Sequence, residues 1–302
     1  LLKLVPIMLA FFAMGFVDLV GIATNYVKKD FELSDSVANL FTSMVFFWFL
    51  VCSVPTGMLM NKIGRRKTVI LSLVLTSVAL IIPLIDYNLP LILISFSLLG
   101  ISNAVMQVSL NPLLSNIVSD KRLSSALTFG QFVKAIAAFT APIIAAWGAL
   151  HFNNWRLLFA VYLVEGVIAA AALSFEKIKE EEMTGRASTF KDAFRFWATV
   201  LLCFIGIVCH VGIDVGTNVS APRIIMDKLG LSLTEAGYAT SVYFLFRTMG
   251  CLAGTFILAN FSTRRFYAVS IFLLAAGMLG LLLFRSSAAL YACIALIGFN
   301  NA

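Results

Sequence analysis

A short basic loop between two long apolar runs reads Gly57-Met-Leu-Met-Asn-Lys-Ile-Gly-Arg-Arg-Lys67. The flanking runs, residues 37–60 and 68–86, each have the roughly 20 largely apolar residues that a helix needs to cross the hydrocarbon core of a bilayer. Lys and Arg accumulate in the cytoplasmic loops of membrane proteins, and four of them lie in this loop. The pattern predicts two membrane-spanning helices joined by a cytoplasmic turn.

The rest of the chain repeats this pattern. Of 302 residues, 61% are apolar and 12% are charged, about half the charged share of an average soluble domain. This composition excludes a soluble enzyme, a disordered chain and a disulfide-stapled secreted module. The runs are continuous and do not alternate with a period of two, which favours helices over barrel strands. We therefore predict an all-α polytopic membrane protein with ten spans, at residues 4–27, 37–60, 68–86, 89–116, 123–150, 155–175, 196–222, 233–260, 265–284 and 287–302.

The basic residues predict how these spans are oriented. With alternate connections assigned to one side, fourteen of the 22 Lys and Arg residues fall on the side of Lys3 and six on the other. The positive-inside rule makes the richer side cytoplasmic. The expected location is a bacterial inner membrane, crossed many times from a cytoplasmic N-terminus. The net charge of +7 then comes mostly from basic residues in the cytoplasmic loops. No nucleic-acid partner is expected.

An internal repeat divides the chain. Shifting it by 198 residues places Gly100 on Gly298 and Asn103 on Asn301, with Thr42 and Ser43 on the matching pair after residue 239. We predict a six-helix unit at 1–175, a cytoplasmic linker at 176–195 and a second unit at 196–302 that stops within its fourth helix, the tenth of twelve. Parallel six-helix repeats are typical of transporters whose binding site lies at the repeat interface near the midplane of the membrane.

The loop at 57–67 resembles the signature of the major facilitator superfamily, Gly-x-Leu-x-Asp-Arg-x-Gly-Arg-Arg/Lys. The resemblance implies a gating and topological role for Gly57, Asn61, Gly64, Arg65 and Arg66. Asn61 replaces the family aspartate, so an ion pair from that position is ruled out here. A basic loop that only fixes topology is the alternative.

Other segments resemble the fucose-permease-like sugar:proton symporters. These are residues 100–112, Thr128-Phe129 with Phe132, His210-Val-Gly-Ile-Asp214 and Arg247-Thr-Met-Gly250. The resemblance implies the major facilitator fold, sugar:proton symport and a gating role for Arg247. Two departures are clear: Gln107 stands where that family has a glutamate ligand, and Asp18 lies about one turn before the family aspartate.

Ionisable side chains deep in the spans are candidates for proton coupling, because a charge at mid-bilayer is costly and is kept for a function. Asp18 lies about 21 Å along the first span at 1.5 Å per residue. His210 and Asp214 are four residues apart and share a helix face. We predict proton coupling at Asp18, Asp214 and His210, with structural ion pairs or packing as the alternative.

Amide side chains are suited to a hydroxylated or zwitterionic solute, because they donate and accept hydrogen bonds without a charge to desolvate. Three of them follow one face of the fourth span at intervals of four residues. Interhelical hydrogen bonding is the alternative role. With the one deep lysine, the predicted substrate-binding residues are Asn25, Asn103, Gln107, Asn111, Gln131, Lys134 and Asn301.

Together these features predict a monomeric secondary transporter that moves a small polar solute, a sugar, with a proton by alternating access. Sodium is an alternative coupling ion. The sequence has no nucleotide-binding loop or hydrolase motif, and no cofactor, metal or enzyme activity is expected. The alternatives are a proton-coupled exporter of drugs or metabolites and a membrane sensor or scaffold that does not transport.

Overall fold

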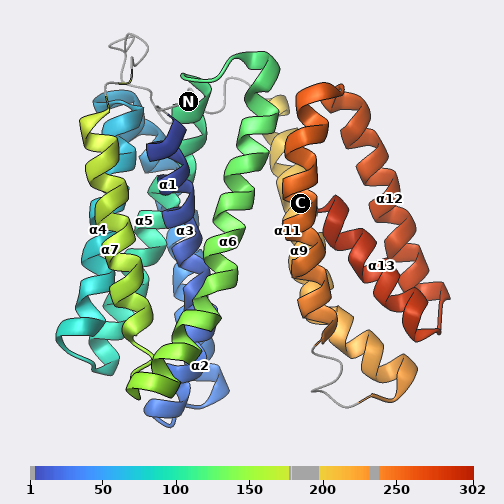
Figure 1. Cartoon of the computed structure of the whole chain (residues 1–302), viewed down its shortest axis with the longest axis horizontal. Helices are drawn as coiled ribbons and strands as arrows, with labels where there is room; N and C mark the ends of the chain where they lie inside the picture. Colours follow the sequence, from blue (N-terminus) through green and yellow to red (C-terminus); the bar gives the residue numbers. More distant parts are fainter. Residues whose placement is uncertain (1–3, 177, 179–196, 232–237) are drawn as a thin grey trace. The chain divides into compact units, whose positions relative to one another are not determined.

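The computed structural model describes residues 4–176, 178, 197–231 and 238–302. Every element within these ranges is a helix (Figure 1). The elements before the linker are α1 (Leu4–Met14), the 3₁₀ helix η1 (Gly15–Asp18), α2 (Leu19–Asp30), α3 (Asp35–Ile63), α4 (Arg65–Ile85), α5 (Leu89–Ser115), α6 (Asp120–Phe152) and α7 (Leu157–Phe175). Those after it are α9 (Trp197–Leu229), α11 (Tyr238–Asn260), α12 (Thr263–Leu283) and α13 (Ser287–Asn300).

Where the structure describes their ends, the predicted spans are confirmed within a few residues, except that α9 continues to Leu229, well past the predicted end at 222. Nine helices in the described part of the chain are long and apolar enough to cross a membrane, and α13 is a shorter apolar helix. Apolar side chains cover their outer faces, as a lipid-facing surface requires. The predicted linker at 176–195 and the beginning of the span at 233–260 lie almost wholly outside the described residues.

The first span differs from the continuous helix that its composition suggests. It is one 27-residue apolar segment, Leu4–Asp30, but the 3₁₀ turn η1 separates α1 from α2. A Cβ atom on Gly15 would lie 2.5 Å from the backbone oxygen of Lys134, so α6 can approach only a glycine here. A short 3₁₀ segment inside a longer helix often marks a functional hinge. Asp18 is the last residue of this turn.

The basic loop turns at Gly64, whose φ of 95° lies in the region that favours glycine. Its arginines then reach the carboxyl ends of two other helices. Arg65 donates to the Pro112 carbonyl at 3.0 Å and to the Asn116 side chain, at the end of α5. Arg66 donates to the Leu173 carbonyl at 3.0 Å, at the end of α7. Helix carboxyl ends carry unpaired carbonyls and partial negative charge, so these contacts stabilise the bundle.

The helices form two compact units. Unit 1 consists of the helices before the linker, except for the segment Ser124–Phe132 of α6. Unit 2 consists of that segment and the helices after the linker. Within unit 2 the Ser125 hydroxyl donates to the Thr255 carbonyl of α11 at 2.5 Å.

One helix contact occurs in both units at positions related by the 198-residue repeat. In unit 1 a Cβ on Gly100 of α5 would lie 2.9 Å from the Cα of Val45 on α3. In unit 2 a Cβ on Gly298 of α13 would lie 2.5 Å from the backbone oxygen of Tyr243 on α11. Close backbone approach at a glycine is typical of helix packing in membranes. Gly57 of the signature loop has open space around it, so no such approach depends on that glycine.

Candidate functional site

Unit 1 contains a pocket of about 270 Å³ beside the 3₁₀ turn of the first span. Apolar side chains from η1, α2 and α3 make most of its wall. Five polar side chains complete it, and all except Thr42 are among the predicted site residues: Asp18, Thr42, Asn103, Gln107 and Lys134. An apolar wall with a few convergent polar groups is the usual construction of a small-molecule site.

The two charged groups of the pocket lie on different elements, Asp18 on η1 and Lys134 on α6. No ion pair joins them within the described chain. Asp18 is exposed and Lys134 is half-buried, so both side chains are accessible from the pocket. An anion and a cation that are separated in one pocket can each bind a ligand group, which a paired couple could not do without first breaking its own bond.

Asn103 is a buried amide beside the pocket. Its side chain is 5% exposed and lines the pocket, and neither its amide nitrogen nor its amide oxygen hydrogen-bonds to any described residue. Buried polar atoms without a partner are costly, and this amide keeps both its donor and its acceptor unused beside the pocket. Gln107, one turn along α5, lies in the same wall.

Other predicted residues fall outside this pocket. Asn111, the third member of the amide face, is exposed and does not line the wall, and the same holds for Asn25 on α2. Gln131 is half-buried on the segment of α6 that belongs to unit 2. The repeat interface proposed from the sequence as the location of a site stays a prediction.

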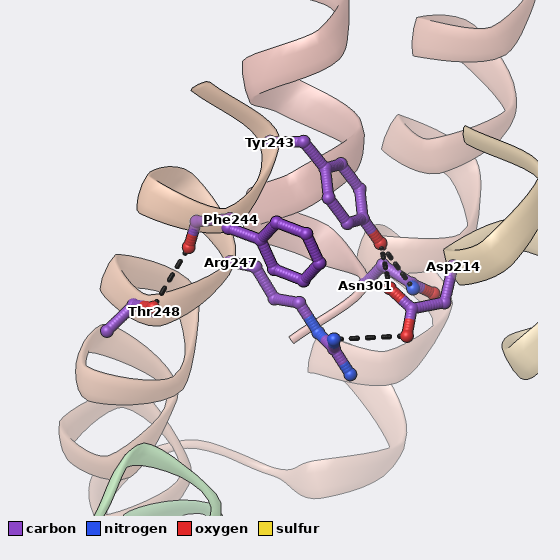
Figure 2. Close-up of polar contacts among 6 residues, drawn as sticks. All are labelled: Asp214, Tyr243, Phe244, Arg247, Thr248 and Asn301. Carbon is purple, nitrogen blue, oxygen red and sulfur yellow. Dashed lines mark hydrogen bonds and ion pairs between the residues drawn. The ribbon is translucent and has the colours of Figure 1, made fainter. Parts of the chain in front are cut away.

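Unit 2 holds a polar network of its own, shown in Figure 2. Arg247 of α11 forms an ion pair with Asp214 of α9, with 3.0 Å between Nη1 and Oδ2. The Tyr243 hydroxyl donates to the other Asp214 oxygen at 2.6 Å. The Asn301 amide, just after α13, donates to that hydroxyl at 3.0 Å. The network therefore joins three helices and gives both carboxylate oxygens of Asp214 a partner.

This network shows what its members contact. Asp214 bonds Arg247 and Tyr243, which matches the structural ion pair given as the alternative to proton coupling, while His210 lies exposed one turn earlier on α9. The gating role that the resemblance implies for Arg247 stays a prediction. Tyr243 was missed, because its flanking sequence Ser-Val-Tyr-Phe-Leu-Phe resembles ordinary apolar packing. The only available signal was its position one turn before Arg247.

The described residues contain no group of three or more His, Cys, Asp or Glu side chains placed to hold a metal ion. A comparison with known families fits these features. The sequence profile of the Major Facilitator Superfamily matches residues 7–302. The chain belongs to the major facilitator superfamily.

Curated relatives of the chain are named for different solutes. The chain is 24% identical over 275 residues to a glucose/galactose transporter of Brucella abortus, a match covering 84% of this chain and 65% of that protein. It is 24% identical over 255 residues to a nitrite extrusion protein of Bacillus subtilis, covering 82% and 62%. It is 25% identical over 288 residues to a gentisate transporter of Corynebacterium glutamicum, covering 87% and 61%. The chain thus spans about two thirds of the length of these superfamily members.

Solved structures of the superfamily share the fold. The E. coli fucose:proton symporter superposes with a TM-score of 0.77 at 14% identity, covering 97% of this chain and 80% of that one. A proton:xylose symporter superposes with a TM-score of 0.69 at 16% identity, covering 98% and 78%. The fold-level resemblance inferred from the signature loop and the fourth span is therefore confirmed.

Proposed function

We propose that this protein is a secondary active transporter that moves a small hydroxylated solute, a sugar, together with a proton by alternating access. The observation that carries the proposal is the pocket of unit 1. It combines an unpartnered amide on Asn103, a second amide on Gln107 and an accessible carboxylate on Asp18. Amides and carboxylates are the groups that hydrogen-bond sugar hydroxyls, and the apolar wall can cover a sugar face.

Asp18 is the proposed proton carrier. It lies in the pocket without an ion-pair partner among the described residues, on the 3₁₀ turn that interrupts the first span. A carboxylate in a membrane-embedded pocket is costly to keep charged while the pocket closes, and a proton removes that cost. Protonation would therefore permit the solute-loaded protein to change conformation. Asp214 is a weaker candidate, because Arg247 and Tyr243 already stabilise its charge.

The test is uptake by protein reconstituted in lipid vesicles with an alkaline interior. Labelled glucose and galactose are the first probes, because a relative carries both in its name. We expect accumulation by the wild type and loss of accumulation in Asp18→Asn, with solute exchange at equal pH retained. Accumulation by Asp18→Asn equal to that of the wild type would contradict the proton-carrying role. Asp214→Asn is the comparison variant.

A second candidate is transport of a small anion, which Lys134 favours. Its ammonium group lies in the pocket wall and forms no ion pair within the described chain. Two relatives are named for anions, nitrite and gentisate. Uptake of labelled gentisate, lost in Lys134→Gln and accompanied by no sugar uptake, would favour this function. Sugar uptake that persists in Lys134→Gln would exclude an essential anion site.

A further inference from the structure

Glu165 is a buried carboxylate that neither the pocket of unit 1 nor the network of unit 2 uses. It lies in the middle of α7, within a membrane-spanning segment. Both of its carboxylate oxygens are buried, and neither hydrogen-bonds to any described residue. It is not among the residues that line the pocket. Its surroundings therefore supply neither water from the pocket nor a protein donor.

The nearby hydroxyl groups are committed elsewhere. The Tyr162 hydroxyl, one turn earlier on α7, donates to the Ala137 carbonyl at 2.5 Å. The Ser77 hydroxyl, which faces Gly166 beside Glu165, donates to the Leu73 carbonyl at 2.9 Å. Each of these protons satisfies a backbone carbonyl of a neighbouring helix. None of them is left to stabilise a negative charge on Glu165.

Charged groups on the surrounding helices do not stabilise it either. α7 packs against α4 and the α1 segment, and Tyr162 also contacts α6. Between its ends α4 carries no ionisable side chain. Away from the helix ends, the ionisable groups of the other elements are Asp18 in the first-span turn, Lys134 on α6 and Tyr162 on α7 itself. Within the described residues, none of them forms an ion pair or a hydrogen bond with Glu165.

An ionised carboxylate without a partner is among the most costly groups to bury, and such a group takes up a proton instead. We propose that Glu165 is a proton-binding site of unit 1 and holds its proton in the packing seen here. Loss of that proton needs water or a hydrogen-bond donor to reach the carboxylate, which requires α7 to separate from its neighbours. Where the proposed symport function holds, Glu165 is then a second proton carrier besides Asp18.

Infrared spectroscopy of the protein in lipid vesicles tests this directly, because a protonated carboxylic acid has a C=O stretch that an ionised carboxylate lacks. We expect a wild type minus Glu165→Gln difference spectrum at neutral pH to contain that band. In Glu165→Asp the band should move. Asp18→Asn is the matched control, since it removes an exposed carboxylate from the same unit and should leave the Glu165 band in place.

A difference spectrum without the protonated band would overturn the proposal, as would a band that Asp18→Asn removes and Glu165→Gln does not. Glu165→Asp keeps the test valid if the glutamine variant fails to fold, because a band that does not move between wild type and Glu165→Asp also overturns the assignment. The measurement needs no solute. A failed uptake assay would therefore reject symport and leave the Glu165 proton site standing.

Discussion

At membrane-embedded positions that the 198-residue repeat relates, unit 2 has a polar network and unit 1 has mostly apolar side chains. In unit 2, the network residues bond one another and leave both Asp214 oxygens satisfied. The positions 198 residues earlier in unit 1 are mostly apolar, and three of the four line the pocket. The equivalent pairs are Asp214 with Phe16, Tyr243 with Val45, Arg247 with Phe49, and Asn301 with Asn103.

This difference separates a closed polar network in unit 2 from an open pocket in unit 1. Where unit 2 has charges that neutralise each other, unit 1 has apolar wall and places its charges nearby at Asp18 and Lys134. Both units keep the glycine contact that sets the helix spacing, at Gly100 and Gly298. This helix contact is therefore shared, and the side chains around it decide whether a unit holds a polar network or a pocket.

The strongest test of the unit 2 network is Arg247→Met. It leaves Asp214 in a membrane-embedded network with no cation, and breaking a buried pair costs about 3–5 kcal/mol. Because both side chains are partly exposed, we expect a loss of about 2–3 kcal/mol in the free energy of unfolding. Denaturant unfolding in detergent measures it. Asp214→Asn combined with Arg247→Met should recover part of the loss; a double variant no better than the single one would mean that the pair is not the source.

The shared framework is tested by alanine at each equivalent glycine. Gly298→Ala should cost about 2–3 kcal/mol, because its Cβ would meet the Tyr243 backbone, which cannot rotate away. Gly100→Ala should cost somewhat less, since its closest contacts are 2.9 and 3.0 Å. Gly206→Ala is the control, because nothing lies within 4 Å of its Cβ position. Equal stability of all three variants would disprove the equivalent close contact.

Asn103 and Asn301 occupy equivalent positions and should separate binding from stability. Asn103→Ala removes an amide with no protein partner, so we expect solute affinity to fall about tenfold, or 1.4 kcal/mol, with little change in stability. Asn301→Ala removes the bond to the Tyr243 hydroxyl and should cost about 1 kcal/mol of stability. Affinity from exchange kinetics and thermal unfolding of the same preparations measure both. A loss of stability in Asn103→Ala together with a loss of affinity in Asn301→Ala would contradict this comparison.

The sequence predicts the helical framework well, because spans and loops follow from apolar length and basic charge alone. Four of the five polar pocket residues were also foreseen, since a deep ionisable or amide side chain stands out in an apolar run; Thr42 was not. The 3₁₀ turn at Gly15–Asp18 was missed; it begins where Gly15 packs against the backbone of α6, a contact far away in the chain. The partner of Asp214 was missed for the same reason: spacing along α9 suggested His210, and only the packing of α11 brings Arg247 and Tyr243 to it.

The smallest expected effect concerns the ends of α2 and α9, which the 198-residue repeat relates. In unit 2 Lys228 donates to the carbonyls of Leu281, Leu282 and Phe284 at the end of α12. The equivalent residue of unit 1 is Asp30, which accepts from the Tyr87 hydroxyl at 2.7 Å and from the Trp155 indole at 2.9 Å. The same junction is thus held by a cation on carbonyls in one unit and by a carboxylate on aromatic donors in the other.

The stability that the unit 1 junction contributes should fall at alkaline pH, because Tyr87 is one of its hydrogen-bond donors. Burial and the hydrogen bond to Asp30 raise the pKa of Tyr87 above its ordinary value of 10.0. Because the raised pKa belongs to the folded state, the contribution of about 1 kcal/mol is complete below pH 10 and is lost as the pH rises further. Thermal unfolding from pH 8 to 11 measures it, with Tyr87→Phe as the control that lacks the titrating group. Lys228→Met removes the unit 2 junction and leaves Tyr87 intact, so this variant should lose stability above pH 10 as the wild type does. If Tyr87→Phe loses stability equally steeply above pH 10, another group is responsible for the decline.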